Sequence, residues 1–206
     1  MKFYDAACKL SNVMRFTVDQ LDAEYSAAEH SFRVAILSLA MAEEYNENRT
    51  PDMSELCVLE TLKKALCHDW EESRVGDLMS PLKQFPGFKA LYSQAAEQAM
   101  KEEVLVDFPA GKEKLLKLWK EDKEGLSGEV IQIADKLEAF CACAHELSRG
   151  NLTMKGPYEN IRPWFYESKN AAMMAKFKVS LKILNDAETA AQEFFDFRAG
   201  TLKLAG

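Results

Sequence analysis

The chain has 206 residues, enough for one sizeable core, and this length favours a single domain over two. Glycine (9) and proline (6) together make up about 7% of residues, 48% are apolar and 29% are charged, which excludes disordered, collagen-like and disulfide-scaffold proteins. The formal net charge of −7 opposes binding to long nucleic acids and to anionic membrane surfaces. A few local cations can still hold a small phosphorylated molecule.

No targeting signal is visible at the N-terminus. Asp5 stands where a signal peptide would begin its apolar run. The longest apolar stretch, 34 to 42, is far shorter than the roughly 18 residues that a membrane-spanning helix needs. We therefore expect a cytoplasmic protein with no membrane partner.

Helical periodicity dominates the chain, and glycine and proline separate the helices. The expected helices cover 3 to 14, 27 to 46, 51 to 75, 88 to 105, 112 to 122, 128 to 148 and 169 to 198. Ser26 and Glu29 form a capping-box pattern that opens the second helix, and Pro51 stands in the first turn of the third. Nothing alternates with period two for the length of a strand. The sequence predicts one all-α domain over 1–206, mostly helices with short loops.

The placement of the histidines is the informative feature. His30 shares the apolar stripe of its helix with Val34, Leu37 and Met41, where a polar ring is costly unless it has a partner. Asp69 directly follows His68 and continues another apolar stripe, formed by Val58, Leu62, Ala65 and Leu66. A carboxylate in the core needs a cation. A third acid, Asp135, borders the buried arc of the helix expected over 128 to 148.

Two imidazoles and two carboxylates from three helices suit one divalent transition metal, Mn, Fe, Co or Zn. A water that completes the shell would lose a proton near neutral pH and become a nucleophile. Glu72 falls between His68 and Asp69 around the helix axis, one turn further along. From there it could exchange protons with this water or with a leaving group.

A purely structural interpretation of these residues remains open. A histidine on an apolar stripe is more often a hydrogen-bonded core residue than a ligand, and a His-Asp pair is common by chance. The presence of Asp135 and Glu72 favours a metal site over this structural interpretation.

Three other features are expected to be structural. His145 has polar neighbours and is expected at the surface or at a helix end. The alternating charges of 112 to 123 predict a helix that faces solvent, for which solvation is a sufficient role. The C-terminal aromatic cluster is expected in core packing or in a homodimer contact, and consists of Phe194, Phe195 and Phe197.

The order His30, His68-Asp69, Asp135 resembles the H…HD…D signature of HD-domain metal-dependent phosphohydrolases. The matching local sequences are Ala28-Glu29-His30-Ser31, Leu66-Cys67-His68-Asp69-Trp70-Glu71-Glu72, Gly76-Asp77 and Ala134-Asp135-Lys136-Leu137-Glu138. The branch with the bacterial 5'-deoxynucleotidases adds a glutamate three residues and an acid eight residues after the HD aspartate, as Glu72 and Asp77 stand here. The resemblance covers about residues 12–145, and the helices of 150–206 are expected to pack on that part.

The resemblance implies an HD-type helical bundle in which one divalent transition metal is held by His30, His68, Asp69 and Asp135. Glu72 would be the acid/base, and Arg15 would orient the substrate phosphate. The resemblance also assigns the nucleoside pocket, which would be lined by Phe16, Asp77, Leu78, Met79 and Ser80. The deoxynucleotidases have a tryptophan where this chain has Phe16, and a smaller ring leaves more room beside the sugar.

We therefore expect a metal-dependent hydrolase of a small phosphomonoester, in particular a nucleoside or deoxynucleoside 5'-monophosphate, that uses a metal-activated water. With three histidines in the chain, a second metal position is hard to furnish, so one metal is expected. Two alternatives stay open. One is a non-catalytic metal- or nucleotide-binding HD module, and the other is an oxygenase, which would need further ligands to hold two irons.

Overall fold

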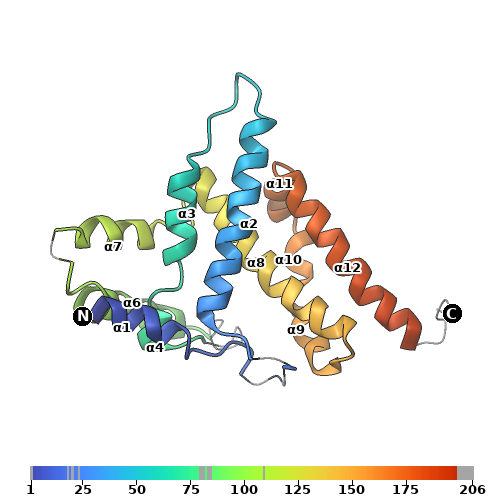
Figure 1. Ribbon diagram of the computed structural model, residues 1–206, viewed down its shortest axis with the longest axis horizontal. Coiled ribbons are helices and arrows are strands. Elements are labelled where there is room, and N and C mark those ends of the chain that lie inside the picture. The colour runs from blue at the N-terminus through green and yellow to red at the C-terminus, as the bar shows by residue number, and fades with distance from the viewer. Residues whose placement is uncertain are drawn as a thin grey trace.

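Three helices form the centre of the molecule (Figure 1). The computed structural model describes residues 2–17, 19, 21–22, 24–78, 82, 85–108 and 110–198. The central helices pack against one another and are α2 (Ala27–Glu47), α3 (Val58–Cys67) and α8 (Gly125–Ser148). Their interface is a large apolar core, whose fully buried members include Val34, Ala65, Ile131, Ile133 and Phe140.

Shorter helices flank this centre on both sides (Figure 1). On one side lie α1 (Lys2–Leu10), α4 (Glu72–Val75), α6 (Phe88–Ala99), a π-helical turn (Met100–Val104) and α7 (Lys112–Lys120). On the other side lie a 3₁₀ turn (Leu152–Met154), α9 (Lys155–Ile161), α10 (Pro163–Tyr166), α11 (Ser168–Met174) and α12 (Lys178–Arg198). The long helix α12 packs along α8 and also contacts α2, so the C-terminal helices cover the central core.

The all-α prediction is confirmed, because the described residues form helices and no strand. Their sole β-type pairing is one isolated antiparallel bridge between Met14 and Ser26. Beside it, the Arg15 amide donates to the Tyr25 carbonyl at 2.8 Å, and the Ala27 amide donates to the Val13 carbonyl at 2.8 Å. These bonds close the base of the loop that leads into α2. None of the helices in the described ranges is long and apolar enough to cross a membrane.

The predicted capping box of α2 is present. The Ser26 hydroxyl accepts from the Glu29 amide at 3.3 Å, and the Glu29 carboxylate accepts from the Ser26 amide at 2.9 Å. This reciprocal pair satisfies two of the amide groups that a helix start leaves without a partner. It fixes the first turn of α2, from which His30 projects into the core.

The single helix predicted over 51 to 75 is wrong. Residues 51–57 are not helical, because the Asn46 side chain bonds both the amide and the carbonyl of Leu56, each at 2.9 Å, and so occupies groups that a helix would use. The helix then ends at Cys67, and a tight turn follows in which the Glu72 amide donates to the Asp69 carbonyl at 3.1 Å. Leu66, expected on the buried stripe, is 50% exposed.

The remaining boundaries differ mostly at helix ends. The helix expected over 169 to 198 is broken before Phe177, whose side chain is fully buried in the central core, and 150 to 163 adds short helices that the sequence did not predict. His145 is exposed in the last turn of α8, as expected. In the C-terminal cluster Phe195 packs against the core and Phe197 is 44% exposed, and a homodimer contact there stays a prediction.

Candidate metal centre and its cavity

His30, His68 and Asp69 meet in the interior. One ligand atom from each lies within 4.8 Å of the other two. The two imidazole Nε2 atoms are 3.3 Å apart, and Asp69 Oδ2 lies 3.0 Å from Nε2 of His68 and 3.5 Å from Nε2 of His30. Asp135 borders this trio, with Oδ1 3.3 Å from Nε2 of His30. Ligand atoms placed about 2.1 Å from one metal ion lie roughly 3.0 to 3.4 Å from one another, so these spacings fit a metal site.

The other ring nitrogen of each histidine has its own acceptor. Nδ1 of His68 donates to the Ala65 carbonyl at 2.8 Å, and Nδ1 of His30 donates to the Glu138 carboxylate at 2.6 Å. With both Nδ1 atoms protonated, the two Nε2 atoms direct lone pairs into the same space. Such an arrangement requires a cation between the rings. Carboxylate or carbonyl acceptors on the outer nitrogen are also what orients histidines that bind metals.

The charges of the centre are strongly coupled. Burial would lower the pKa of His68, but the Asp69 carboxylate and its hydrogen bond raise that pKa to about 9. Burial would raise the pKa of Asp69, and the charge of His68 reverses this and holds it well below its ordinary value. The pKa of Asp135 is likewise lowered against the effect of burial, by Lys136 and by the His30 hydrogen bond. Without a metal, a proton on His68 serves as the cation of this site.

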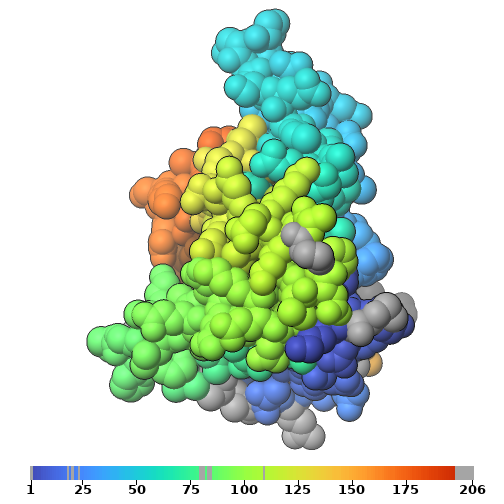
Figure 2. Space-filling model, turned by 90° about the vertical axis from the view of Figure 1, so that its left-hand side faces the viewer, coloured from blue at the N-terminus to red at the C-terminus, as the bar shows by residue number. Residues whose placement is uncertain are grey.

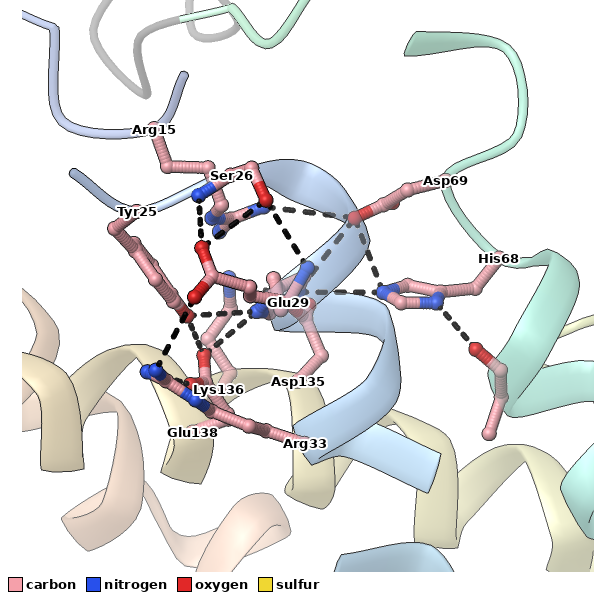
Figure 3. Close-up of polar contacts among 12 residues, drawn as sticks. Arg15, Tyr25, Ser26, Glu29, Arg33, His68, Asp69, Asp135, Lys136 and Glu138 are labelled. Carbon is pink, nitrogen blue, oxygen red and sulfur yellow. Dashed lines mark hydrogen bonds and ion pairs between the residues drawn. The ribbon is translucent and has the colours of Figure 1, made fainter. Parts of the chain in front are cut away.

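Arg15 reaches the centre from the loop before α2. Figure 3 shows the Asp69 carboxylate between Arg15 and His68, and the guanidinium Nη1 lies 3.5 Å from Asp69 Oδ2. Burial would lower the pKa of Arg15, but the charges of Asp69, Asp77 and Glu72 raise it above its ordinary value. Within the described residues the buried Nε of Arg15 has no hydrogen-bond acceptor. This N–H group is a donor that an anionic ligand can use.

A cavity of about 680 Å³ opens beside the trio, within the size range of small-molecule sites. Its walls come from the turn after α3 and from α4, α6, α7 and the turn before α8. Figure 2 faces the side of the molecule that carries α6 and α7. Glu72, which is 3% exposed, and Glu71 both line the cavity. Burial and the charge of Asp69 raise the pKa of Glu71 to about 7, against a hydrogen bond from Trp119 at 2.7 Å.

The residues predicted around the nucleoside do not line this cavity where the structure describes them, and their role stays a prediction. Phe16, Asp77 and Leu78 are half-buried, and none of the three lines this cavity. Phe16 has a φ of 53°, which a residue with a bulky side chain seldom adopts, and its ring stacks on Tyr25 with 6.0 Å between the centroids. Asp77 acts electrostatically on Arg15. Met79 and Ser80 lie outside the described residues.

The residue that orients the His30 ring, Glu138, was not predicted from the sequence. Glu138 is 4% exposed, and its carboxylate accepts hydrogen bonds from His30 and from the Tyr25 hydroxyl (Figure 3). It also forms an ion pair with Arg33, whose Nη1 lies 3.5 Å away. The sequence position of Glu138 could have predicted this role. Glu138 lies three residues after Asp135 and therefore on the same face of α8. The charge run 112 to 123 was also misjudged as solvated only, since Trp119, Lys120, Asp122 and Lys123 line the cavity.

The fold matches solved structures of HD phosphohydrolases. A crystal structure of an HD-domain phosphohydrolase from Listeria innocua has a TM-score of 0.74 and 24% identity, covering 97% of this chain and 95% of its own. A conserved protein from Pyrococcus furiosus has a TM-score of 0.69 and 21% identity, covering 89% and 98%. The cyanophage S-2L HD phosphohydrolase, bound to dA and one catalytic Zn²⁺ ion, has a TM-score of 0.57 and 19% identity, covering 91% and 95%. No curated protein sequence gives a significant match.

The family assignment rests on the sequence. The model of the YfbR-like 5'-deoxynucleotidases matches residues 2–181, which extends the predicted resemblance of 12–145 in both directions and takes in the short helices after α8. The chain therefore belongs to the YfbR-like 5'-deoxynucleotidase family and has the HD-domain fold.

Proposed function

We propose that this protein is a metal-dependent phosphomonoesterase that releases phosphate from nucleoside or deoxynucleoside 5'-monophosphates. The observation that carries the proposal is the pair of Nε2 atoms that face each other at 3.3 Å beside Asp69, within a chain of the YfbR-like family. His30, His68, Asp69 and Asp135 would hold one divalent transition metal. When bound, such an ion supplies Lewis acidity, which makes water a nucleophile near neutral pH and offsets phosphoryl charge.

The remaining roles follow from burial and charge. Glu72 is buried in the cavity wall next to Asp69, where its carboxylate can accept a proton from the attacking water and return it to the leaving oxygen. The Arg15 guanidinium, with a free Nε donor among the described residues, can hold phosphate oxygens in the planar geometry that the fork of arginine matches. Phe16 directly follows Arg15, so its ring would lie near the sugar of a nucleotide whose phosphate Arg15 holds, although it is not part of the cavity wall.

The test is a phosphate-release screen over ribonucleoside and deoxyribonucleoside 5'-monophosphates, run with Mn, Co, Zn and Mg after elemental analysis of the purified protein. The Glu72→Ala variant should keep its metal and lose about 10²- to 10⁴-fold in rate. Glu113→Gln, an exposed carboxylate on α7, serves as the control and should keep the wild-type rate.

Three outcomes would contradict the proposal. Stoichiometric metal with no turnover of any monophosphate would favour a binding module, and two irons per chain would favour an oxygenase. A Glu72→Ala variant that holds its metal and hydrolyses at the wild-type rate would remove Glu72 from the mechanism.

A further inference from the structure

Lys123 lines the same cavity as His68 and Asp69, from the turn between α7 and α8. Lys123 is exposed. The charges of Asp135, Asp122 and Asp69 raise the pKa of its ammonium group above the ordinary value of lysine, against partial desolvation by the surrounding protein. Because two of these acids belong to the candidate metal centre, the Lys123 ammonium lies within the electric field of that centre. It is therefore positively charged at neutral pH.

The backbone of this turn is fixed from three directions. The Gln132 side chain donates to the Lys123 carbonyl at 3.1 Å, and the buried Lys64 ammonium donates to the Glu124 carbonyl at 2.8 Å. Gly128 lets the turn approach α8 so closely that a Cβ there would lie 2.2 Å from the carbonyl carbon of Lys123. A ligand that binds Lys123 therefore has to order only the side chain, because the backbone is already held in place.

Within the described residues, the ammonium group of Lys123 is also not engaged in an ion pair. Lys120, which lines the same cavity, forms an ion pair with Glu97 at 2.7 Å. In the part of the chain that the structure describes, no carboxylate forms such a pair with Lys123 within 4.0 Å. The four acids that raise its pKa, which are Asp135, Asp122, Asp69 and Glu71, act on it through space, and its hydrogen-bond donors remain available to a ligand.

We propose that Lys123 binds the phosphate group of the substrate inside this cavity. The inference rests on the proposed phosphomonoesterase function and names a second protein cation for the phosphate, on the cavity side of Asp69, whereas Arg15 reaches Asp69 from the loop before α2. A phosphate dianion that enters the cavity meets the carboxylates of Asp69, Glu72 and Asp122, so it needs fixed positive charge in addition to a metal ion. Lys123 supplies this charge as a point donor with three N–H groups.

The test measures binding of inorganic phosphate to the metal-loaded protein by isothermal titration calorimetry, for the wild type, Lys123→Gln and Lys123→Arg. We expect Lys123→Gln to weaken phosphate binding about tenfold and to raise KM for 5'-monophosphates by a similar factor, because one charge-assisted contact is lost. Lys123→Arg should recover most of the affinity. Lys117→Gln removes one exposed charge from α7 outside the cavity, and its phosphate affinity should equal that of the wild type.

The outcomes separate this inference from the proposed function. Phosphate affinity of Lys123→Gln within a factor of two of the wild type would overturn the role of Lys123, even in an active enzyme. A wild type that binds no phosphate would overturn it as well. A wild type that binds phosphate through Lys123 and hydrolyses no monophosphate would instead leave the binding site standing and refute the phosphomonoesterase. Metal content must be equal in all variants, since Lys123 is not a ligand.

Discussion

The Glu138→Gln substitution tests whether the carboxylate that accepts a hydrogen bond from His30 sets the metal affinity of the site. In the wild type the Glu138 carboxylate accepts from Nδ1 of His30 at 2.6 Å, which fixes the ring and makes its Nε2 more basic. Glutamine has the same shape, and its carbonyl oxygen can accept the same bonds from His30 and Tyr25. Its amide group then faces the Arg33 guanidinium, which is half exposed and free to move away.

The expected magnitude follows from the type of bond that is lost. A charge-assisted hydrogen bond contributes about 1.5 to 3 kcal/mol and a neutral one about 0.5 to 1.5 kcal/mol, so the exchange costs roughly 1 to 1.5 kcal/mol. One factor of ten in affinity is about 1.4 kcal/mol, so Glu138→Gln should bind metal about tenfold more weakly. The fold should remain, because the buried volume is unchanged.

The assay is a calorimetric titration of chelator-treated protein with Zn²⁺ and with Mn²⁺, accompanied by thermal unfolding of the metal-free form. Glu146→Gln is the matched control. Glu146 is a second buried carboxylate of α8, 7% exposed, but it accepts from the Asp22 amide at 2.9 Å and from Asn151 at 2.8 Å, away from the centre. Equal metal affinities of Glu138→Gln and Glu146→Gln, both within threefold of the wild type, would refute the orienting role of Glu138.

Four further predictions use other parts of the site. His68→Ala should lose stoichiometric metal and the stabilisation that metal gives to the folded state, as seen by elemental analysis and by a melting temperature that no longer responds to added metal. In metal-free protein the folded pKa of His68, about 9, lies above its unfolded value, so the protonated ring stabilises the fold; this contribution is fully present below about pH 6.5 and disappears as the pH rises through 9. Urea unfolding should show a loss of roughly 3 kcal/mol between these limits that His68→Gln lacks. Gly128→Ala should displace the Lys123 turn and weaken phosphate binding with every charge retained, and an unchanged affinity would mean that the turn accommodates the methyl group. Phe16→Trp should raise the ratio of kcat/KM for deoxy- over ribonucleotides, and a constant ratio would place this ring away from the sugar.

The sequence predicted the parts of this protein that depend on local pattern. The helical class, the capping box at Ser26 and the proximity of His30, His68 and Asp69 followed from periodicity and from an ordered set of polar residues on apolar stripes. A polar side chain on an apolar stripe needs a polar partner in the core. The polar residues on the stripes therefore indicated that the helices meet there.

The parts that failed depend on contacts between distant segments. Asn46 prevents a helix at 51–57 by bonding the backbone of Leu56, and no local propensity contains this contact. Glu138 was missed because its partners His30 and Tyr25 lie 108 and 113 residues away in the chain. Lys123 belongs to a charge run that fits a solvated helix, and only the packing of α6 and α7 next to the turn after α3 makes a cavity there.

The hydrogen bonds that close the loop before α2 make the position of Arg15 independent of the length of that loop. The bonds from Arg15 to Tyr25 and from Ala27 to Val13 hold both ends of the loop, and Phe16 and Leu21 inside it pack against the core. Residues added between these anchored positions leave the backbone of Arg15 and the start of α2 in place. Doubling the length of such a loop costs only about 0.6 kcal/mol in closure entropy. A longer loop can therefore be built on the same base while Arg15 keeps its position beside Asp69.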